Sequence, residues 1–155
     1  MKIEHTPVTG REEKDNLMPQ MRALSEFYEA LNSRDMEKMA QNWVPSDEAV
    51  MDNPLGGIKR GWEEIRDVYE RLFGSRSEYR FEFYDYTLHG AGELFYVVGR
   101  ERGMFSMEGT VLDLAIRTSR IFRLMDGRWR QVHHHGSIED PDLLASYQKA
   151  VLGKG

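Results

Sequence analysis

The sequence contains no cysteine, and this absence removes several kinds of chemistry. A disulfide framework, a thiolate nucleophile and a cysteine zinc site all need a thiol, so none of them applies. Long apolar runs are also missing, because no segment approaches the roughly 20 apolar residues that a membrane helix requires. Residues 1–14 (MKIEHTPVTGREEK) have no apolar stretch of signal-peptide length. We therefore expect a cytoplasmic protein that does not enter a membrane.

An excess of positive charge is absent as well. The formal net charge is −5 at pH 7, and acidic and basic residues are mixed along the chain. Without a basic stripe for phosphate groups, nucleic acid is a poor partner. The chain does have 155 residues with 40% apolar content, which suits one domain with one core. We expect that domain over residues 15–155, after a flexible arm at 1–14.

The first half of the chain has the apolar spacing of helices. The pattern predicts a helix capped at Asp15 or Asn16, a second short helix capped by Asp35 and a third after Gly61. A short strand over residues 48–52 and a Pro/Gly loop precede the third helix.

The second half has the apolar spacing of strands. Strands are predicted over residues 79–88, 94–105, 111–125 and 128–135, followed by a tail helix capped by Asp140. Late strands joined by short turns favour an antiparallel meander over βαβ units. The expected fold class is therefore α+β.

The predicted strands are apolar on both faces, which bears on assembly. Phe95 and Val97 point to one face, whereas Leu94, Tyr96 and Val98 point to the other. An antiparallel sheet with one solvated face alternates with polar residues, so something is expected to cover the second face. Our hypothesis is a homodimer through that face, and the alternative is cover by the tail helix and the N-terminal arm.

Several residue strings carry a family resemblance. FYEALNSRD, then Trp43, MDNPLGG and RGWEEIRDVYERLF resemble the helical half of the SnoaL-like, nuclear transport factor 2-like group, including its ketosteroid isomerases and polyketide cyclases. The string TSRIFRLMDGRWRQVHHHGS is similar to the association domain of calcium/calmodulin-dependent protein kinase II. The resemblance covers about residues 17–138. It implies a cone-shaped, cystatin-like roll in which a curved antiparallel sheet wraps about three N-terminal helices and encloses a pocket, commonly in a dimer, but no single activity.

The resemblance to the isomerases implies positions for catalytic groups. Their oxyanion-donating Tyr matches Phe27, which has no hydroxyl, and their protonated Asp matches Arg120. Their base precedes the loop proline, where this chain has Asp52 and then Asn53, so either one can face the pocket. Steroid isomerisation by that mechanism is disfavoured. An Asp52 base with Arg120 stabilising a developing enolate and His134 shuttling protons remains chemically reasonable.

The resemblance to the association domain implies a different site. Two pocket arginines of that domain match Arg100 and Arg120, and a third falls at Gly136 and is lost. Two converging guanidinium groups suit a carboxylate or a similar anion. Alternatively, Arg100 pairs with Asp113 or Glu101, or lies in water near a strand end.

Three consecutive histidines invite a metal interpretation. His133 and His135 share a strand face at a spacing that can chelate, but no third ligand is identifiable from the sequence. We therefore predict no metal site and a structural role for these two side chains. His134 is expected to face the pocket together with Val132.

Two classes of function remain. One is a small-molecule protein for an anionic or aromatic, polyketide-like ligand, with possible cofactor-free isomerase, lyase or cyclase activity. The other is a non-catalytic ligand-binding or oligomerisation module. The predicted catalytic residues are Asp52, Arg120 and His134. The predicted ligand-binding residues are Phe27, Trp43, Asn53, Tyr69 and Arg100.

Overall fold

The computed structural model describes residues 1–153 of the chain. Within that range the helices are the 3-10 turn η1 (Lys14–Asn16), α1 (Pro19–Ser33), α2 (Met36–Asn42), α3 (Trp62–Gly74) and α4 (Pro141–Leu152). The strands are β1 (Val50–Asp52), β2 (Ile58–Arg60), β3 (Glu78–Ala91), β4 (Leu94–Met107), β5 (Thr110–Met125) and β6 (Arg128–Ser137).

The strands form one curved, six-stranded sheet in the order β2-β1-β6-β5-β4-β3. The predicted meander of β3 to β6 is confirmed, because each of these strands pairs antiparallel with the next. The sheet is mixed rather than purely antiparallel, since β1 runs parallel to β6. This pairing places Val50 beside His133, Met51 beside His134 and Asp52 beside His135.

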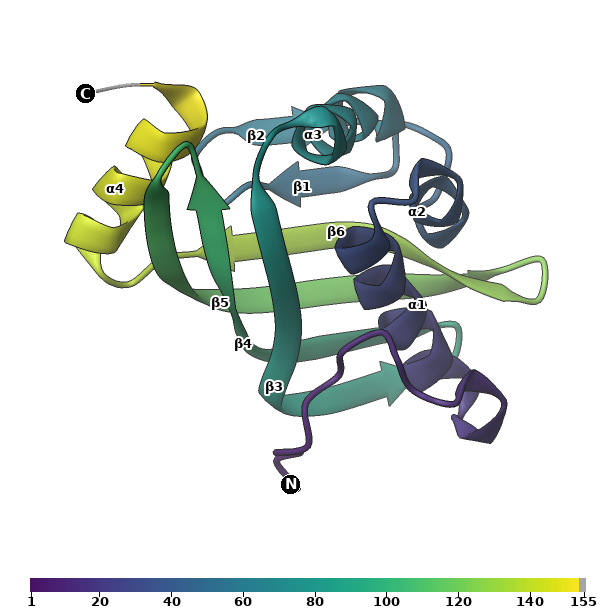
Figure 1. The fold of residues 1–155 in the computed structure, drawn as a ribbon. Helices are drawn as coiled ribbons and strands as arrows, with labels where there is room; N and C mark the ends of the chain where they lie inside the picture. Colours follow the sequence, from purple (N-terminus) through teal and green to yellow (C-terminus); the bar gives the residue numbers. More distant parts are fainter. Residues whose placement is uncertain (154–155) are drawn as a thin grey trace.

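The helices and the sheet make an α+β fold, as the sequence predicts. Figure 1 shows α1, α2 and α3 on one side of the sheet and α4 beside the bends of β4 and β5. The core fills the space between them, and its buried side chains include Leu24, Phe27, Trp43, Phe95 and Phe122. Among the described residues, no helix has both the length and the apolarity to span a membrane.

The helix ends follow the predicted capping chemistry at two of three places. The Asp35 side chain accepts a hydrogen bond from the Lys38 backbone N at 3.0 Å, and Asp140 caps α4 in the same way. The prediction for the first helix is wrong at its start. Asp15 belongs to η1, and α1 begins only at Pro19, whose fixed φ and missing N–H suit the first helical position.

The N-terminal segment departs from the predicted loose arm. Glu4 and Val8 exchange backbone hydrogen bonds with Tyr86 and Phe83 of β3, and Val8 is 3% exposed. The segment therefore lies along the outer edge of β3 (Figure 1) and satisfies backbone groups that this edge strand would otherwise expose.

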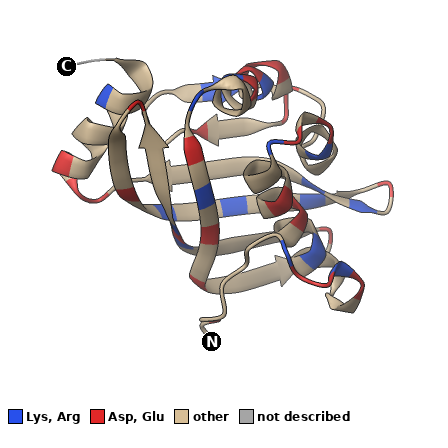
Figure 2. Cartoon of the chain, in the orientation of Figure 1, with Lys and Arg blue, Asp and Glu red and all other residues tan. Residues whose placement is uncertain are grey.

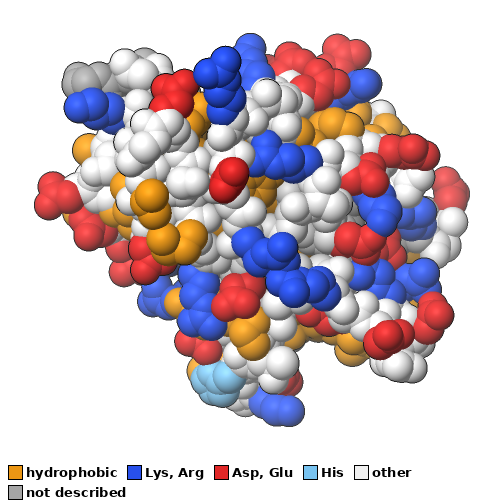
Figure 3. Space-filling view, viewed as in Figure 1, with side chains coloured by type: hydrophobic (Ala, Val, Ile, Leu, Met, Phe, Trp, Pro, Cys, Tyr) orange, Lys and Arg blue, Asp and Glu red, His pale blue; other side chains and the backbone are white. Residues whose placement is uncertain are grey.

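Charged residues of both signs are distributed over the chain. Figure 2 shows both acidic and basic positions on α1, α3 and the strands. In the space-filling view, blue and red side chains are intermixed on the visible face, with apolar patches between them (Figure 3). This distribution agrees with the mixed pattern in the sequence.

Candidate functional site

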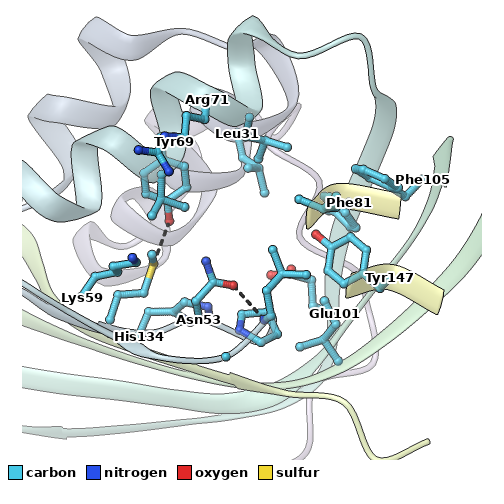
Figure 4. A pocket seen from close by; sticks show the side chains of 18 of the residues that line it. Leu31, Asn53, Lys59, Tyr69, Arg71, Phe81, Glu101, Phe105, His134 and Tyr147 are labelled. Carbon is cyan, nitrogen blue, oxygen red and sulfur yellow. Dashed lines mark hydrogen bonds between the residues drawn. The ribbon is translucent and has the colours of Figure 1, made fainter. Parts of the chain in front are cut away.

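A cavity of about 570 Å³ lies between the concave face of the sheet and the helices. Most of its wall is apolar, and α1, α3, β4, β5, β6, α4 and the β1–β2 loop all contribute to it. Figure 4 shows Tyr69 and Leu31 on one side, Phe81, Phe105 and Tyr147 on another, and His134, Asn53 and Glu101 on the sheet side. A cavity of this size and lining is typical of small-molecule sites, which span roughly 300–1,000 Å³.

The guanidinium of Arg120 is a buried positive charge at this site. Arg120 is 1% exposed and lies on β5 with its side chain on the concave face. It donates to Gln131 Oε1 at 2.8 Å and to Glu101 Oε2 at 3.2 Å. The guanidinium carbon also lies 3.7 Å from the centroid of the Phe27 ring. These contacts pair and orient a charge that would otherwise be costly to bury.

Tyr28 completes the network around Glu101. Its hydroxyl donates to Glu101 Oε2 at 2.7 Å. Burial, and then the charge of Glu101, raise the pKa of Tyr28 well above its ordinary value, so the phenol keeps its proton. Burial would lower the pKa of Arg120, but the surrounding network outweighs burial and raises it, so the guanidinium keeps its charge. The network therefore holds a fixed pattern of donors and one paired carboxylate.

His134 faces the cavity as a neutral imidazole. It is 6% exposed and lies directly opposite Arg120 in the β5–β6 pair. Burial, and then the charge of Arg120, lower its pKa well below its ordinary value. Nδ1 lies 3.3 Å from the Ser119 carbonyl oxygen, which can only accept, so Nδ1 carries the hydrogen and Nε2 carries the lone pair. His134 can therefore accept a proton or a hydrogen bond through Nε2.

Gly136 keeps space open around this imidazole. A Cβ at position 136 would lie 3.0 Å from Pro54 Cδ and 3.3 Å from His134 Nε2. A larger residue there would crowd the loop and the ring. The absence of a side chain at Gly136 thus suits the local packing.

Five of the predicted site residues line the cavity. They are Phe27, Asn53, Tyr69, Arg120 and His134. Burial raises the pKa of Tyr69 to about 12, so its hydroxyl remains a donor, and it contacts Met51 Sδ at 3.8 Å. Asn53, not Asp52, faces the cavity, and its Oδ1 accepts from the Leu55 backbone N at 2.9 Å.

Trp43 and Asp52 lie elsewhere. Trp43 is completely buried in the core, with its ring centroid 6.4 Å from those of Trp62 and Tyr69, and it does not line the cavity. The Asp52 carboxylate is directed to the other side of the sheet, where Oδ2 lies 2.7 Å from His135 Nδ1. The prediction of Asp52 as the base in the pocket is therefore wrong, because the last residue of β1 takes the outer face.

Arg100 also lies outside the cavity. Its side chain is 52% exposed and pairs with Glu139 at 3.1 Å, so the predicted pair of inward arginines is wrong. The inward residue is its neighbour Glu101, which is 7% exposed. Phe95 and Val97 are buried, so odd-numbered residues of β4 take the inner face, and Glu101 follows once the structure shows which of the two apolar faces is the buried one.

A β-bulge in β6 changes which residue accompanies His134. The register shifts between Ile121 and Phe122, so that Phe122 pairs with Gln131 and not with Val132. Gln131 is completely buried and links Arg120 to Asn42, which accepts from Gln131 Nε2 at 3.2 Å. Gln131 therefore joins His134 on the inner face, while Val132, the unpaired residue of the bulge, is half-buried and packs against the core.

Comparisons with known proteins agree with this architecture. Residues 21–141 match the sequence profile of a family described as the SnoaL-like domain. The F-box protein SKIP8 of Arabidopsis thaliana is 23% identical over 128 residues, which cover 83% of this chain and 51% of that protein. The chain thus spans about half the length of this curated relative.

Solved structures show the same fold at low sequence identity. A candidate dehydratase of the NTF2-like family from Streptomyces avermitilis is 19% identical, with a TM-score of 0.71 over 77% of this chain and 93% of that one. The association domain of calcium/calmodulin-dependent protein kinase II from C. elegans is 22% identical, with a TM-score of 0.63 over 76% and 92%.

Proposed function

Because this chain belongs to the SnoaL-like domain family, we propose that it binds a small molecule in the cavity between the sheet and the helices. The observation that carries the proposal is an apolar cavity of about 570 Å³ with buried polar groups on its sheet side. Apolar walls with a few oriented polar groups are the usual composition of ligand sites.

The lining favours a ligand with an aromatic or alicyclic body and one acceptor or anionic group. Arg120 lines the cavity, and its positive charge favours an acceptor or anionic group on the ligand. Lys59 and Arg71 also line the cavity and favour a negative group on the ligand. Glu101 neutralises Arg120, which makes a strong carboxylate clamp at Arg120 alone less favourable.

The same groups support cofactor-independent proton transfer, with His134 in place of Asp52 as the base. His134 Nε2 takes a proton from the carbon next to a carbonyl, and the enolate oxygen that forms accepts a hydrogen bond from Arg120. The proton on His134 exchanges with water, and delivery of a proton from His134 to the same or another carbon completes an exchange or an isomerisation. The Glu101 carboxylate accepts hydrogen bonds from both Tyr28 and Arg120 and so holds the guanidinium in place.

Binding is tested by thermal shift with small carboxylates, ring ketones and polyketide-like aromatics. The cavity is blocked by Leu72→Trp, which adds an indole at a lining position. Val111→Trp, at a position that is 59% exposed, is the matched control. We expect at least one compound to stabilise the wild type and the control but not Leu72→Trp. Equal stabilisation of all three proteins, or of none, contradicts the proposal.

Turnover is tested separately by deuterium exchange. Ring ketones are incubated with the protein in D2O, and NMR is used to follow deuterium at the carbon next to the carbonyl. We expect this carbon to gain deuterium. His134→Gln is expected to lose about 10²-fold or more of this rate, the usual range for removing a positioned base. Binding without exchange in the wild type favours the non-catalytic ligand-binding function.

The outer face of the sheet supports a second part of the proposal, a homodimer. Leu94, Tyr96 and Val98 remain 39%, 40% and 45% exposed. The tail helix does not cover them, because it packs through Tyr147 against Phe105 on the cavity side. Light scattering at micromolar concentration is expected to give a dimer mass, and Val98→Glu is expected to give a monomer. A monomeric wild type contradicts this part.

A further inference from the structure

The outer face of the sheet brings together three side chains with metal-ligand chemistry. Asp52 of β1 and His133 and His135 of β6 each present a ligand atom, and these atoms lie within 4.8 Å of one another. Parallel pairing of β1 with β6 creates the group, because it aligns Asp52 with His135. The two histidines share a face because they are two residues apart on one strand.

We propose that Asp52, His133 and His135 form a binding site for a divalent transition-metal ion. Two imidazole nitrogens and one carboxylate oxygen suit zinc and its neighbours in the first transition row, whereas calcium and magnesium prefer oxygen ligands alone. The three side chains are half-buried to exposed, so the remaining coordination positions are open to water or to a group from another molecule.

A hydrogen bond to the backbone orients the His133 ring. His133 Nδ1 lies 2.8 Å from the Val50 carbonyl oxygen, which can only accept a hydrogen bond. Nδ1 therefore carries the hydrogen, and the lone pair is on Nε2. A second hydrogen bond of this kind fixes the tautomer and the ring orientation of metal-binding histidines in many proteins. A contact of 2.7 Å between Asp52 Oδ2 and His135 Nδ1 holds the other two ligands side by side.

This site is separate from the cavity. His134 lies between the two ligand histidines in the strand, but its side chain is on the opposite face of the sheet, where it lines the cavity. Binding at the outer face therefore makes no use of Arg120 or of the enclosed space. A ligand in the cavity and a cation on the outer face can be measured independently.

The first test is titration calorimetry of the full chain, produced without a histidine tag, with Zn²⁺ as the probe. We expect one ion per chain. Asp52→Asn, His133→Ala and His135→Ala are each expected to weaken binding by more than about tenfold, since even changes behind the ligands cost about 10–100-fold. His89→Ala is the matched control, because His89 contacts Thr87 and Tyr96, away from the cluster. Its affinity is expected to equal that of the wild type.

A measurement on the wild type alone guards against variants that fold poorly. Side-chain NMR signals of His133 and His135 are expected to move or broaden when Zn²⁺ is added, whereas those of His134 and His89 stay in place. Both tests together support the site. The proposal is overturned if the wild type binds no stoichiometric ion, if the cluster variants bind as well as His89→Ala, or if the zinc-dependent changes fall on His134 and not on the cluster.

Discussion

A carboxylate contacts a nitrogen-bearing side chain on each face of the sheet, and the two contacts differ in burial more than in distance. On the concave face, the distance between Arg120 Nη2 and Glu101 Oε2 is 3.2 Å, and the two side chains are 2% and 9% exposed. On the outer face, the distance between Asp52 Oδ2 and His135 Nδ1 is shorter, at 2.7 Å, but the two side chains are 29% and 53% exposed. Water screens the outer pair, whereas each inner charge depends on its partner. The longer contact is therefore expected to be the more important one for stability.

The three consecutive histidines repeat this comparison within one strand. His134 is 6% exposed, and burial lowers its pKa well below the ordinary value. His133 and His135 lie on the outer face beside Asp52. Strand alternation thus gives neighbouring, chemically identical residues different roles: one beside the enclosed cavity and two in the proposed cation site.

Breaking the inner pair is expected to give the largest effect. Arg120→Leu leaves the Glu101 carboxylate buried with only Tyr28 as a donor and should lower the free energy of unfolding by about 3–5 kcal/mol. Urea unfolding measures this loss. The double variant Arg120→Leu/Glu101→Leu removes both charges and should recover part of the stability. Additive losses in the double variant would show that the two charges do not depend on each other.

The pH dependence of the free energy of unfolding is expected to depend on His134 and not on His135. The folded pKa of His134 is lowered, so below the unfolded value of about 6.5 the unfolded chain binds a proton that the native state does not. Stability is then complete above that pH and falls as pH decreases, by up to about 1.4 kcal/mol per unit. Urea unfolding between pH 8 and pH 5 should show this slope for the wild type.

His134→Gln removes the buried imidazole and should flatten that slope. His135→Gln is the control, because it keeps His134 and should keep the slope with it. If the two variants have the same pH profile, the buried histidine is not its source.

Much of the fold could be predicted from local sequence patterns. Asp35 and Asp140 cap their helices as predicted, and the Asp126-Gly127 turn joins β5 to β6. These features depend on a few adjacent residues and on backbone chemistry that is the same in any protein.

The errors in the site have a common physical origin. Both faces of β4 are apolar, so the pattern did not show whether Arg100 or Glu101 points inward. A single extra residue in β6 placed Gln131 on the inner face, where strict alternation from His134 would not put it. Contact between Asp52 and His135 depends on parallel pairing of segments far apart in the chain. Long-range register is not encoded in local periodicity, and a shift of one residue moves a side chain to the other face.

The same carboxylate-to-amide change can be made on both faces of the sheet, so that the two losses of stability can be compared directly. The smallest effect is expected on the outer face. Asp52→Asn and Glu101→Gln each replace a carboxylate with an amide of similar size. Measured by urea unfolding with a chelator present, Asp52→Asn should change the free energy of unfolding by only about 0–1 kcal/mol, because exposed pairs contribute little. Glu101→Gln leaves the Arg120 charge buried without its counter-ion and should cost several times more. If both variants lose the same stability, burial is not what distinguishes the two pairs.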